Sequence, residues 1–174
     1  MSSVVISGDT SGAITVAVPA VAGTNTVTIA AQTGTLNAAG PAFSANLATD
    51  QSVTSSTWTK ARLNNEQFDT NNNFDSSTNY RFTPTVAGYY QINGVINTAV
   101  SGAATRTICA IYKNGSEYLR GGDVSGVAST VSAVISFNGS TDYVEFYGWV
   151  ASVTTPAFTS GAQSGFSGSL VRGA

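Results

Sequence analysis

The sequence predicts an all-β protein, an antiparallel sandwich or jelly roll, on three observations. From Val53 to Ala174 no stretch shows the apolar period of an amphipathic helix. Short runs rich in Val, Ile, Thr and aromatic residues alternate apolar and polar positions instead, as strands buried on one face do. Turn residues separate these runs at short intervals. Together they predict about eight to ten strands with loops at the two ends of the fold.

The stretch Arg81–Ile92 is the most informative, because it combines a short strand, a turn and the start of a longer strand. Pro84 has no backbone N–H to donate to a ladder, so the first strand ends there. Gly88 supplies backbone freedom at the corner. Beyond the corner, one set of residues alternates with its neighbours at strand period, and we expect this set to face the core. The set is Tyr90, Ile92, Gly94 and Ile96.

The chain divides into three parts. Residues 1–36 hold short strands with small side chains and have too little apolar bulk to fold alone, so we expect this anchoring segment to pair with copies of itself or to dock onto a larger body. Its candidate anchoring residues are Val5, Ile14, Val16, Val18, Val27 and Ile29. Residues 37–50 contain a Gly-Pro break and predict a linker, with room for a half-turn of helix at Phe43–Leu47. Residues 51–174 are the expected head domain.

Within the head, the first strand is expected over residues 51–66, followed by a polar loop from Asp69 to Thr78. Asparagines at the tip of that loop tolerate left-handed backbone. Later strands are expected at Thr105–Lys113, Ser116–Arg120, Val127–Phe137, Tyr143–Ser152 and Phe166–Val171. The pair Asn114-Gly115 predicts a two-residue hairpin turn, since Asn-Gly accepts positive φ at both central positions. Asn138-Gly139 predicts a second tight connection. Residues 153–165 are expected to form a long exposed loop.

Charge is unusually scarce. Of 174 residues, 9% are charged and 42% are hydrophobic, with a net charge of −2. A monomer with so few charges has little to keep it dispersed, so we expect subunit faces to bury one another. The few basic residues are scattered, which argues against nucleic-acid binding. No run of about 18 apolar residues predicts a membrane span. The N-terminus has no basic region ahead of an apolar run, and we expect no secretory signal.

The residue types needed for most enzyme chemistry are missing. The sequence has no histidine, which removes Ser-His-Asp triads, Cys-His pairs and histidine metal sites. Cys109 is the single cysteine and is expected to be a small buried apolar residue. No glycine-rich phosphate loop followed by Lys and Ser or Thr occurs. We therefore expect a protein that is not an enzyme and has no cofactor, apart from a structural calcium ion as a remote alternative.

Two groups of residues are candidates for ligand contact. Asp69, Asp75 and Asp123 could supply carboxylate oxygens to calcium, although turn capping is the simpler reading and no EF-hand spacing supports a site. Exposed aromatic rings can stack on sugars, or they can be buried between subunits, where aromatic residues are enriched. The candidates for a trimer interface or a ligand site are Trp58, Tyr89, Tyr147, Trp149 and Phe158.

Several of these stretches resemble a known family. Phe82, Gly88 and Tyr90, with five residues and one residue between them, resemble the central signature of the complement 1q globular head. Ile111–Gly115, Asp142–Phe146 and Phe166–Val171 resemble its mid-domain hairpin, its penultimate strand and its closing strand. The resemblance covers residues 51–174. It implies a complement 1q/tumour necrosis factor-like jelly roll that forms a homotrimer.

The resemblance also implies how the penultimate strand is oriented. Both of its alternating sets of residues are bulky, so both cannot face a single core. The family places one set in the core, namely Val144, Phe146, Gly148 and Val150. The other set would then face a partner, a ligand or water, and consists of Tyr143, Glu145, Tyr147 and Trp149.

Residues 1–36 resemble the N-terminal segments of bacteriophage tail and fibre proteins. The two resemblances together imply a trimeric short fibre or knob on the phage particle, attached through residues 1–36 to a capsid or tail protein. The head would adhere to a component of the host surface, with a glycan as the expected ligand. One alternative is a capsid decoration, cement or head-fibre protein with a purely structural role. The other is a secreted trimeric lectin or signalling ligand.

Overall fold

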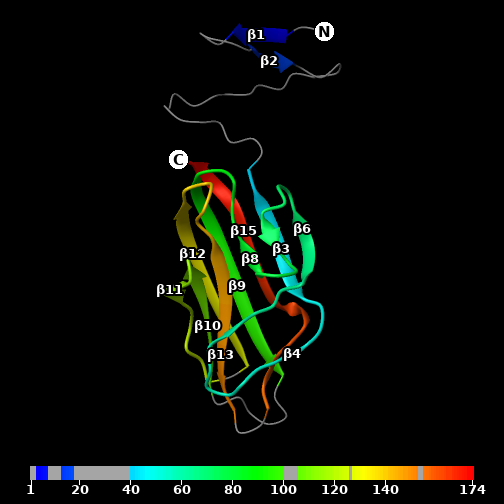
Figure 1. The fold of residues 1–174 in the computed structure, drawn as a ribbon, viewed down its shortest axis with the longest axis vertical. Coiled ribbons are helices and arrows are strands. Elements are labelled where there is room, and N and C mark those ends of the chain that lie inside the picture. The colour runs from blue at the N-terminus through cyan, green and yellow to red at the C-terminus, as the bar shows by residue number, and fades with distance from the viewer. Residues whose placement is uncertain (1–2, 8–12, 18–39, 100–105, 126, 153–154) are drawn as a thin grey trace, which may run out of the picture. The chain divides into compact units, whose positions relative to one another are not determined.

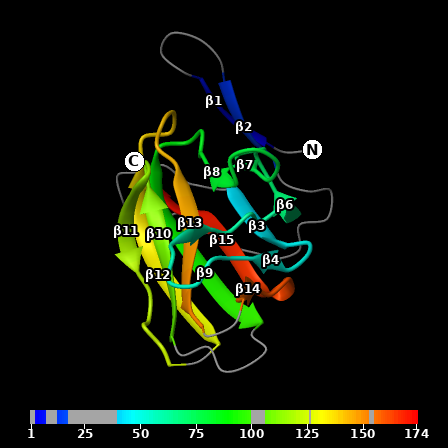
Figure 2. The same ribbon diagram turned by 60° about the horizontal axis from the view of Figure 1, so that its bottom comes forward.

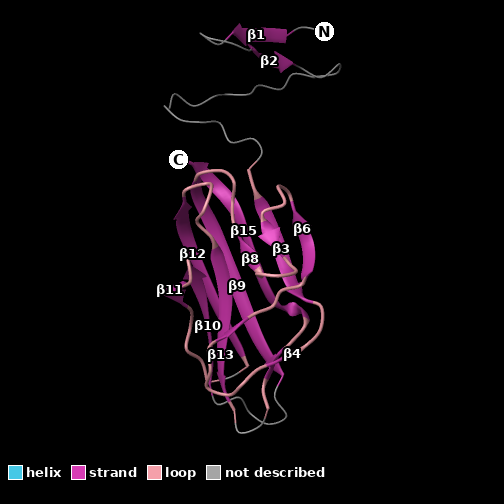
Figure 3. Ribbon diagram, viewed as in Figure 1, coloured by secondary structure: helices cyan, strands magenta, loops and turns pink. Residues whose placement is uncertain are grey.

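The computed structural model describes residues 3–7, 13–17, 40–99, 106–125, 127–152 and 155–174. The chain divides into two compact units, Met1–Gly34 and Thr35–Ala174. The described part of the first unit is an antiparallel hairpin of β1 (Ser3–Ser7) and β2 (Ala13–Ala17). The second unit, here called the head, contains strands only (Figure 3), and no helix occurs in the described ranges. This confirms the predicted all-β class.

The head consists of two antiparallel sheets. In the first, called the β9 sheet, the order is β4-β14-β9-β15-β3-β6, and β12 pairs with β9. Its strands are β3 (Ala42–Leu47), β4 (Gln51–Ser52), β6 (Asn65–Asp69), β9 (Gly88–Ala99), β12 (Ala128–Phe137), β14 (Ala157–Phe158) and β15 (Gly161–Gly173). The C-terminal strand β15 lies between β9 and β3, so the two ends of the head sequence pair in one sheet (Figure 1).

The second sheet, called the β13 sheet, has the order β11-β10-β13-β8-β7, and β5 also pairs with β13. Its strands are β5 (Thr59–Lys60), β7 (Phe74–Asp75), β8 (Arg81–Phe82), β10 (Arg106–Lys113), β11 (Ser116–Arg120) and β13 (Val144–Ala151). This sheet lies over the β9 sheet as a second layer (Figure 2). Strands that are neighbours in space are mostly distant in sequence, as a jelly roll requires.

Aromatic rings fill the space between the two sheets. Phe43 on β3 stacks on Phe82 of β8, with ring centroids 4.3 Å apart, and Phe146 on β13 stacks on Phe166 of β15 at 5.1 Å. Tyr90 is fully buried and its hydroxyl donates a hydrogen bond of 2.7 Å to the Val86 carbonyl. Each contact joins strands of opposite sheets or ties a strand to its entry turn, so the rings hold the sandwich closed.

The predicted alternation is confirmed in the two central strands. Tyr90, Ile92 and Ile96 of β9 are fully buried, as are Val144, Phe146 and Val150 of β13. Glu145 departs from the prediction for its set, because it is 6% exposed and forms an ion pair with Lys60. The Asn114-Gly115 turn has φ of +52° and +80°, as predicted for a type I′ hairpin.

Three boundaries drawn from the sequence are wrong. Residues 42–47 form β3 and belong to neither a linker nor a helical turn, because Phe43, Ala45 and Leu47 are buried at strand period. Residues 51–66 do not form one strand, since β4 and β5 lie in opposite sheets with a turn between them. The expected loop over residues 153–165 contains β14 and the first part of β15.

Candidate functional site: an uncharged sheet face

Four adjacent strands of the β9 sheet carry almost no charge. Strands β3, β9 and β12 contain no charged residue, and β15 contains only Arg172, near its C-terminal end. We call the outward side of these four strands the uncharged face. Its residues are small polar or apolar: Ala42, Ser44, Asn46, Tyr89, Gln91, Asn93, Val95, Asn97, Thr130, Ser132, Val134, Ser136, Gly165, Ser167, Ser169 and Val171. Alternation along each strand places these residues on the side of the sheet that faces away from the core.

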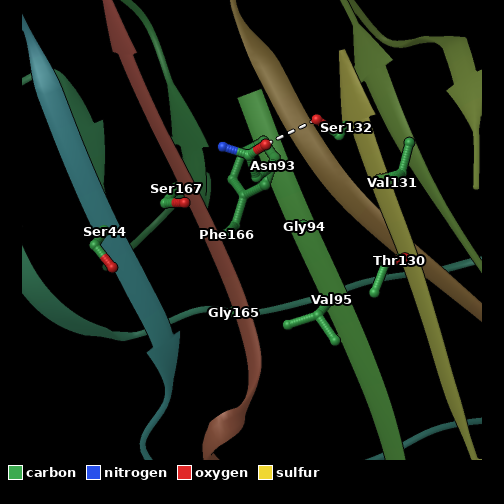
Figure 4. A pocket seen from close by; sticks show the side chains of 10 residues that line it. All are labelled: Ser44, Asn93, Gly94, Val95, Thr130, Val131, Ser132, Gly165, Phe166 and Ser167. Carbon is green, nitrogen blue, oxygen red and sulfur yellow. Dashed lines mark hydrogen bonds between the residues drawn. The ribbon is translucent and has the colours of Figure 1, made fainter. Parts of the chain in front are cut away.

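A shallow hollow of about 450 Å³ lies in the middle of this face. Figure 4 shows its lining side chains on four neighbouring strands. Ser44, Gly165 and Ser167 are short, so the surface dips over β3 and β15. Val95 and Thr130 border the hollow on β9 and β12. No charged side chain lines it, so another uncharged surface can cover it without leaving a buried ion behind.

Side-chain amides and hydroxyls on this face satisfy one another. The Gln91 Nε2 donates to Ser132 Oγ at 2.8 Å and to Asn93 Oδ1 at 3.2 Å. Ser132 Oγ donates in turn to Asn93 Oδ1 at 2.9 Å, the bond drawn in Figure 4. Groups already paired within one subunit cost less to desolvate than groups paired with water only. The network therefore suits a surface that becomes buried.

Exposed apolar residues gather at one end of the uncharged face. Tyr89 is 47% exposed, Val134 54% and Val171 59%. The strand registers place Tyr89 opposite Ser136 on β12 and opposite Arg172 on β15, so the three apolar residues lie on neighbouring strands. Contact between large exposed apolar side chains and a partner removes them from water. Tyr89, a candidate from the sequence, thus lies on the uncharged face.

The charged residues lie mainly on the opposite sheet, paired with one another. The ion pairs there are Lys60–Glu145, Arg106–Asp123, Lys113–Asp142 and Arg120–Glu117. Cations also lie over aromatic rings: Arg120 over Trp58, Lys60 over Tyr147 and Arg106 over Trp149, at 5.2, 5.9 and 5.3 Å from the ring centroids. Tyr112 joins Trp58 to Tyr147 and stacks on the latter at 4.0 Å.

The structure therefore separates the aromatic candidates. Trp58, Tyr147 and Trp149 each lie under a cation on the side of the β13 sheet. Tyr89 lies on the uncharged face. Phe158 was wrongly placed on an exposed loop. It is 0% exposed on β14, and its ring packs where a Cβ on Gly148 would lie, so it can contact neither a ligand nor another subunit.

The three aspartates do not converge. Asp69 accepts hydrogen bonds from the backbone N–H groups of Asn71 and Phe74, and the Asp123 carboxylate pairs with Arg106. Asp75 binds the loop that follows it: bonds from the Thr78 N–H and then from Ser77 and Asn79 hold the pKa of its carboxyl well below the usual range. No cluster of three metal-ligating side chains occurs in the described residues. Turn capping explains Asp69 and Asp75, and an ion pair with Arg106 explains Asp123.

Cys109 lies in the core, 0% exposed. Burial raises the pKa of its thiol to about 11, only partly opposed by a hydrogen bond from Ser129. A thiol with so high a pKa holds almost no thiolate at neutral pH and is a poor nucleophile. The sequence-based interpretation of Cys109 as a buried apolar residue is confirmed.

The proposed anchoring residues are only partly described. Val5 pairs with Thr15, Ile14 with Ile6 and Val16 with Val4 across the β1–β2 hairpin. Val18, Val27 and Ile29 lie outside the described residues. In the described ranges no helix is long and apolar enough to cross a membrane.

No protein-family model matches this sequence, and no curated protein matches it. Solved structures similar to the head include a murine protein and a phage protein. Murine APRIL at pH 5.0 has a TM-score of 0.57 and 7% identity, covering 76% of this chain and 100% of its own. The head has a tumour necrosis factor-like jelly-roll fold. The second structure, the vertex protein P5 of phage PRD1, has a TM-score of 0.55 and 13% identity, covering 76% of this chain and 98% of its own. At these identities the likeness concerns the fold alone.

Proposed function

We propose that this protein is a trimeric virion surface protein of a bacteriophage, a short fibre or knob attached through residues 1–36. The head carries the trimer interface on its uncharged face and presents the β13 sheet and the loops to the host. It adheres to a host-surface glycan and is neither an enzyme nor cofactor-dependent. The observation that carries the proposal is the near-absence of charge on four adjacent strands of a chain whose other surface is charged.

A trimer explains that distribution of charge. Burying an unpaired charge between subunits is costly, whereas small polar groups that are already paired can be buried at little cost. Closed rotational symmetry places the same face of every copy at the axis, so one face must be free of repelling charges. The exposed Tyr89, Val134 and Val171 would supply the apolar contacts at one end.

The virion assignment has two supports. The head shares its fold with a phage vertex protein. The described part of the N-terminal unit is a two-stranded hairpin, and such a hairpin is at best marginally stable alone in water. Docking onto a particle would stabilise it. The likeness to APRIL supports the rival, a secreted trimeric ligand, which would be found free of particles.

The interface is tested by the solution mass of the wild type and two variants, measured by light scattering. We expect the wild type to have three times the mass of the 17.7 kDa chain. Asn93→Arg places a charge in the hollow and should yield folded monomers. Tyr118→Arg, on the exposed edge strand β11, is the matched control and should remain trimeric. A monomeric wild type, or a trimeric Asn93→Arg protein, would contradict the proposed interface.

A further inference from the structure

A smaller hollow, of about 240 Å³, has no lining residue on the uncharged face. Its lining comes from three segments that are distant in sequence: the turn after β3, the segment between β5 and β6, and the residue before β8. The strands next to these segments come from both sheets: β3, β4 and β6 belong to the β9 sheet, and β5 and β8 belong to the β13 sheet. The lining residues are Leu47, Thr49, Asp50, Gln51, Arg62, Asn64 and Tyr80.

Hydrogen bonds hold the first two segments in place. The buried Gln51 side chain donates to the Lys60 carbonyl at 2.8 Å and accepts from the Arg62 N–H at 2.8 Å. Asn64 Oδ1 accepts from the Ala48 N–H at 3.0 Å, which joins the two segments directly. Asp50 Oδ1 accepts from the Ser160 N–H at 2.8 Å. The hollow is therefore built before any ligand arrives, as binding sites usually are.

Several polar groups on this lining have no partner among the described residues. The exposed Arg62 guanidinium, the exposed Asn64 amide nitrogen and the Tyr80 hydroxyl make no hydrogen bond or ion pair there, whereas the Asp50 carboxylate accepts from both the backbone and the side chain of Ser160. Hydrogen-bond donors and a carboxylate acceptor thus border one small hollow. The positive charge of Arg62 and the negative charge of Asp50 cancel, so the site has no net preference for an anion or a cation.

Tyr80 has a strained backbone at the same place, with φ of +49°. A bulky aromatic residue rarely adopts left-handed backbone, and such strain persists where neighbouring contacts impose it. Here the Asp75 carboxylate accepts two hydrogen bonds from Asn79, and Lys60 Nζ donates to the Asn79 carbonyl at 3.2 Å. A glycine would fit this backbone without strain, yet the position carries a partly buried aromatic ring that lines the hollow.

We infer that this hollow binds one neutral pyranose unit of a glycan, with Tyr80 as the stacking ring. A sugar ring offers an apolar face to an aromatic side chain and hydroxyls that both donate and accept. Arg62 and Asn64 would donate to hydroxyl oxygens, and the Asp50 carboxylate would accept from one hydroxyl beside its bonds from Ser160. The hollow is smaller than sites for drug-sized molecules, which begin at about 300 Å³. This inference rests on the adhesion role in the proposed function and names its ligand class.

The test is an NMR titration of the isotope-labelled full chain with the methyl glycosides of glucose, galactose and mannose. Binding should shift signals of the lining residues with a millimolar dissociation constant for at least one sugar. Tyr80→Gly removes the ring and relieves the backbone strain. We expect it to weaken binding at least tenfold while the melting temperature stays the same or rises. Tyr118→Gly, which removes an exposed ring outside the hollow, should leave the dissociation constant unchanged.

Two results would overturn the inference. One is that none of the three glycosides shifts the lining signals at 100-fold molar excess. The other is that Tyr80→Gly binds as tightly as the wild type. Neither result depends on the virion, because the purified chain alone is titrated. Failure of the proposed function would appear separately, as full sugar binding by a protein that never associates with phage particles.

Discussion

At single residues, glycine decides how closely the two sheets approach. A Cβ on Gly94 would lie 2.4 Å from the Phe146 ring, and one on Gly148 would lie 2.6 Å from the Phe158 ring. Both positions point into the core from opposite sheets. Each missing side chain leaves the space that an aromatic ring of the facing sheet occupies, so large and small residues interlock. The core is thus filled by rings that rest directly on backbone.

Gly94→Ala should therefore destabilise the head by about 1–3 kcal/mol, because the added methyl must displace the Phe146 ring in a closely packed core. Chemical denaturation monitored by near-UV circular dichroism measures the change. Gly122→Ala is the control, since its nearest contact would be an ordinary 3.7 Å, and it should change stability by less than about 0.5 kcal/mol. Equal effects of the two substitutions would show that the ring does not occupy this place.

At the level of elements, β3 is essential to the head although it lies before the part that resembles a known family. It pairs with the C-terminal strand β15 on one side and with β6 on the other. Phe43 stacks on Phe74 and Phe82 and also contacts the edge of the Phe166 ring. Removing β3 would expose these rings to water. It would also leave the backbone of β15 unpaired on the side that now bonds to β3.

Two truncations test this role. A chain of residues 40–174 should unfold cooperatively on heating, with dispersed NMR signals. A chain of residues 51–174 should aggregate or fail to fold, since it loses Phe43, Ala45 and Leu47 from the core, and each large buried side chain is worth roughly 1.5–3 kcal/mol of burial. A stable, folded 51–174 chain would show that β3 is an accessory strand.

The whole molecule has two unlike surfaces. One side of the sandwich is an uncharged face of small residues, and the other carries paired ions and aromatic rings. The proposed trimer buries the uncharged face. It leaves the charged surface and the small hollow lined by Tyr80 accessible. Three weak sugar sites on one particle component would act together on a surface rich in glycans. Avidity of this kind can exceed the affinity of a single site by about 10²–10⁴-fold.

The trimer and the sugar site therefore make different predictions for one variant. Monomeric Asn93→Arg should bind methyl glycosides as the wild type does, because Asn93 does not line the small hollow. Its binding to host cells, measured by flow cytometry of labelled protein, should fall at least about 100-fold. Undiminished cell binding by a monomer would mean that adhesion uses one strong site and that the trimer serves assembly only.

Local signals in the chain were sufficient for the class, the central strands and the Asn114-Gly115 turn. The prediction of a second tight turn at Asn138-Gly139 was wrong, because β12 and β13, which these residues join, lie in different sheets. Strand alternation depends on which side chains face the core, so Tyr90, Ile92 and Val144 were predictable from their own neighbours. Asn114-Gly115 was predictable because its positive φ values are a local property. The low charge content likewise predicted a surface that other copies would bury, which the solution mass of the protein tests.

Only the tertiary structure decided the features that depend on distant residues. The sequence of residues 42–47 predicts a linker, but in the fold this segment pairs with β15 and β6. The sequence places Phe158 in an exposed loop, but in the fold its ring occupies the space beside Gly148. The uncharged face and the hollow around Tyr80 arise the same way. Both join residues from strands and turns that lie far apart in the sequence, and a local pattern carries no information about which of them meet.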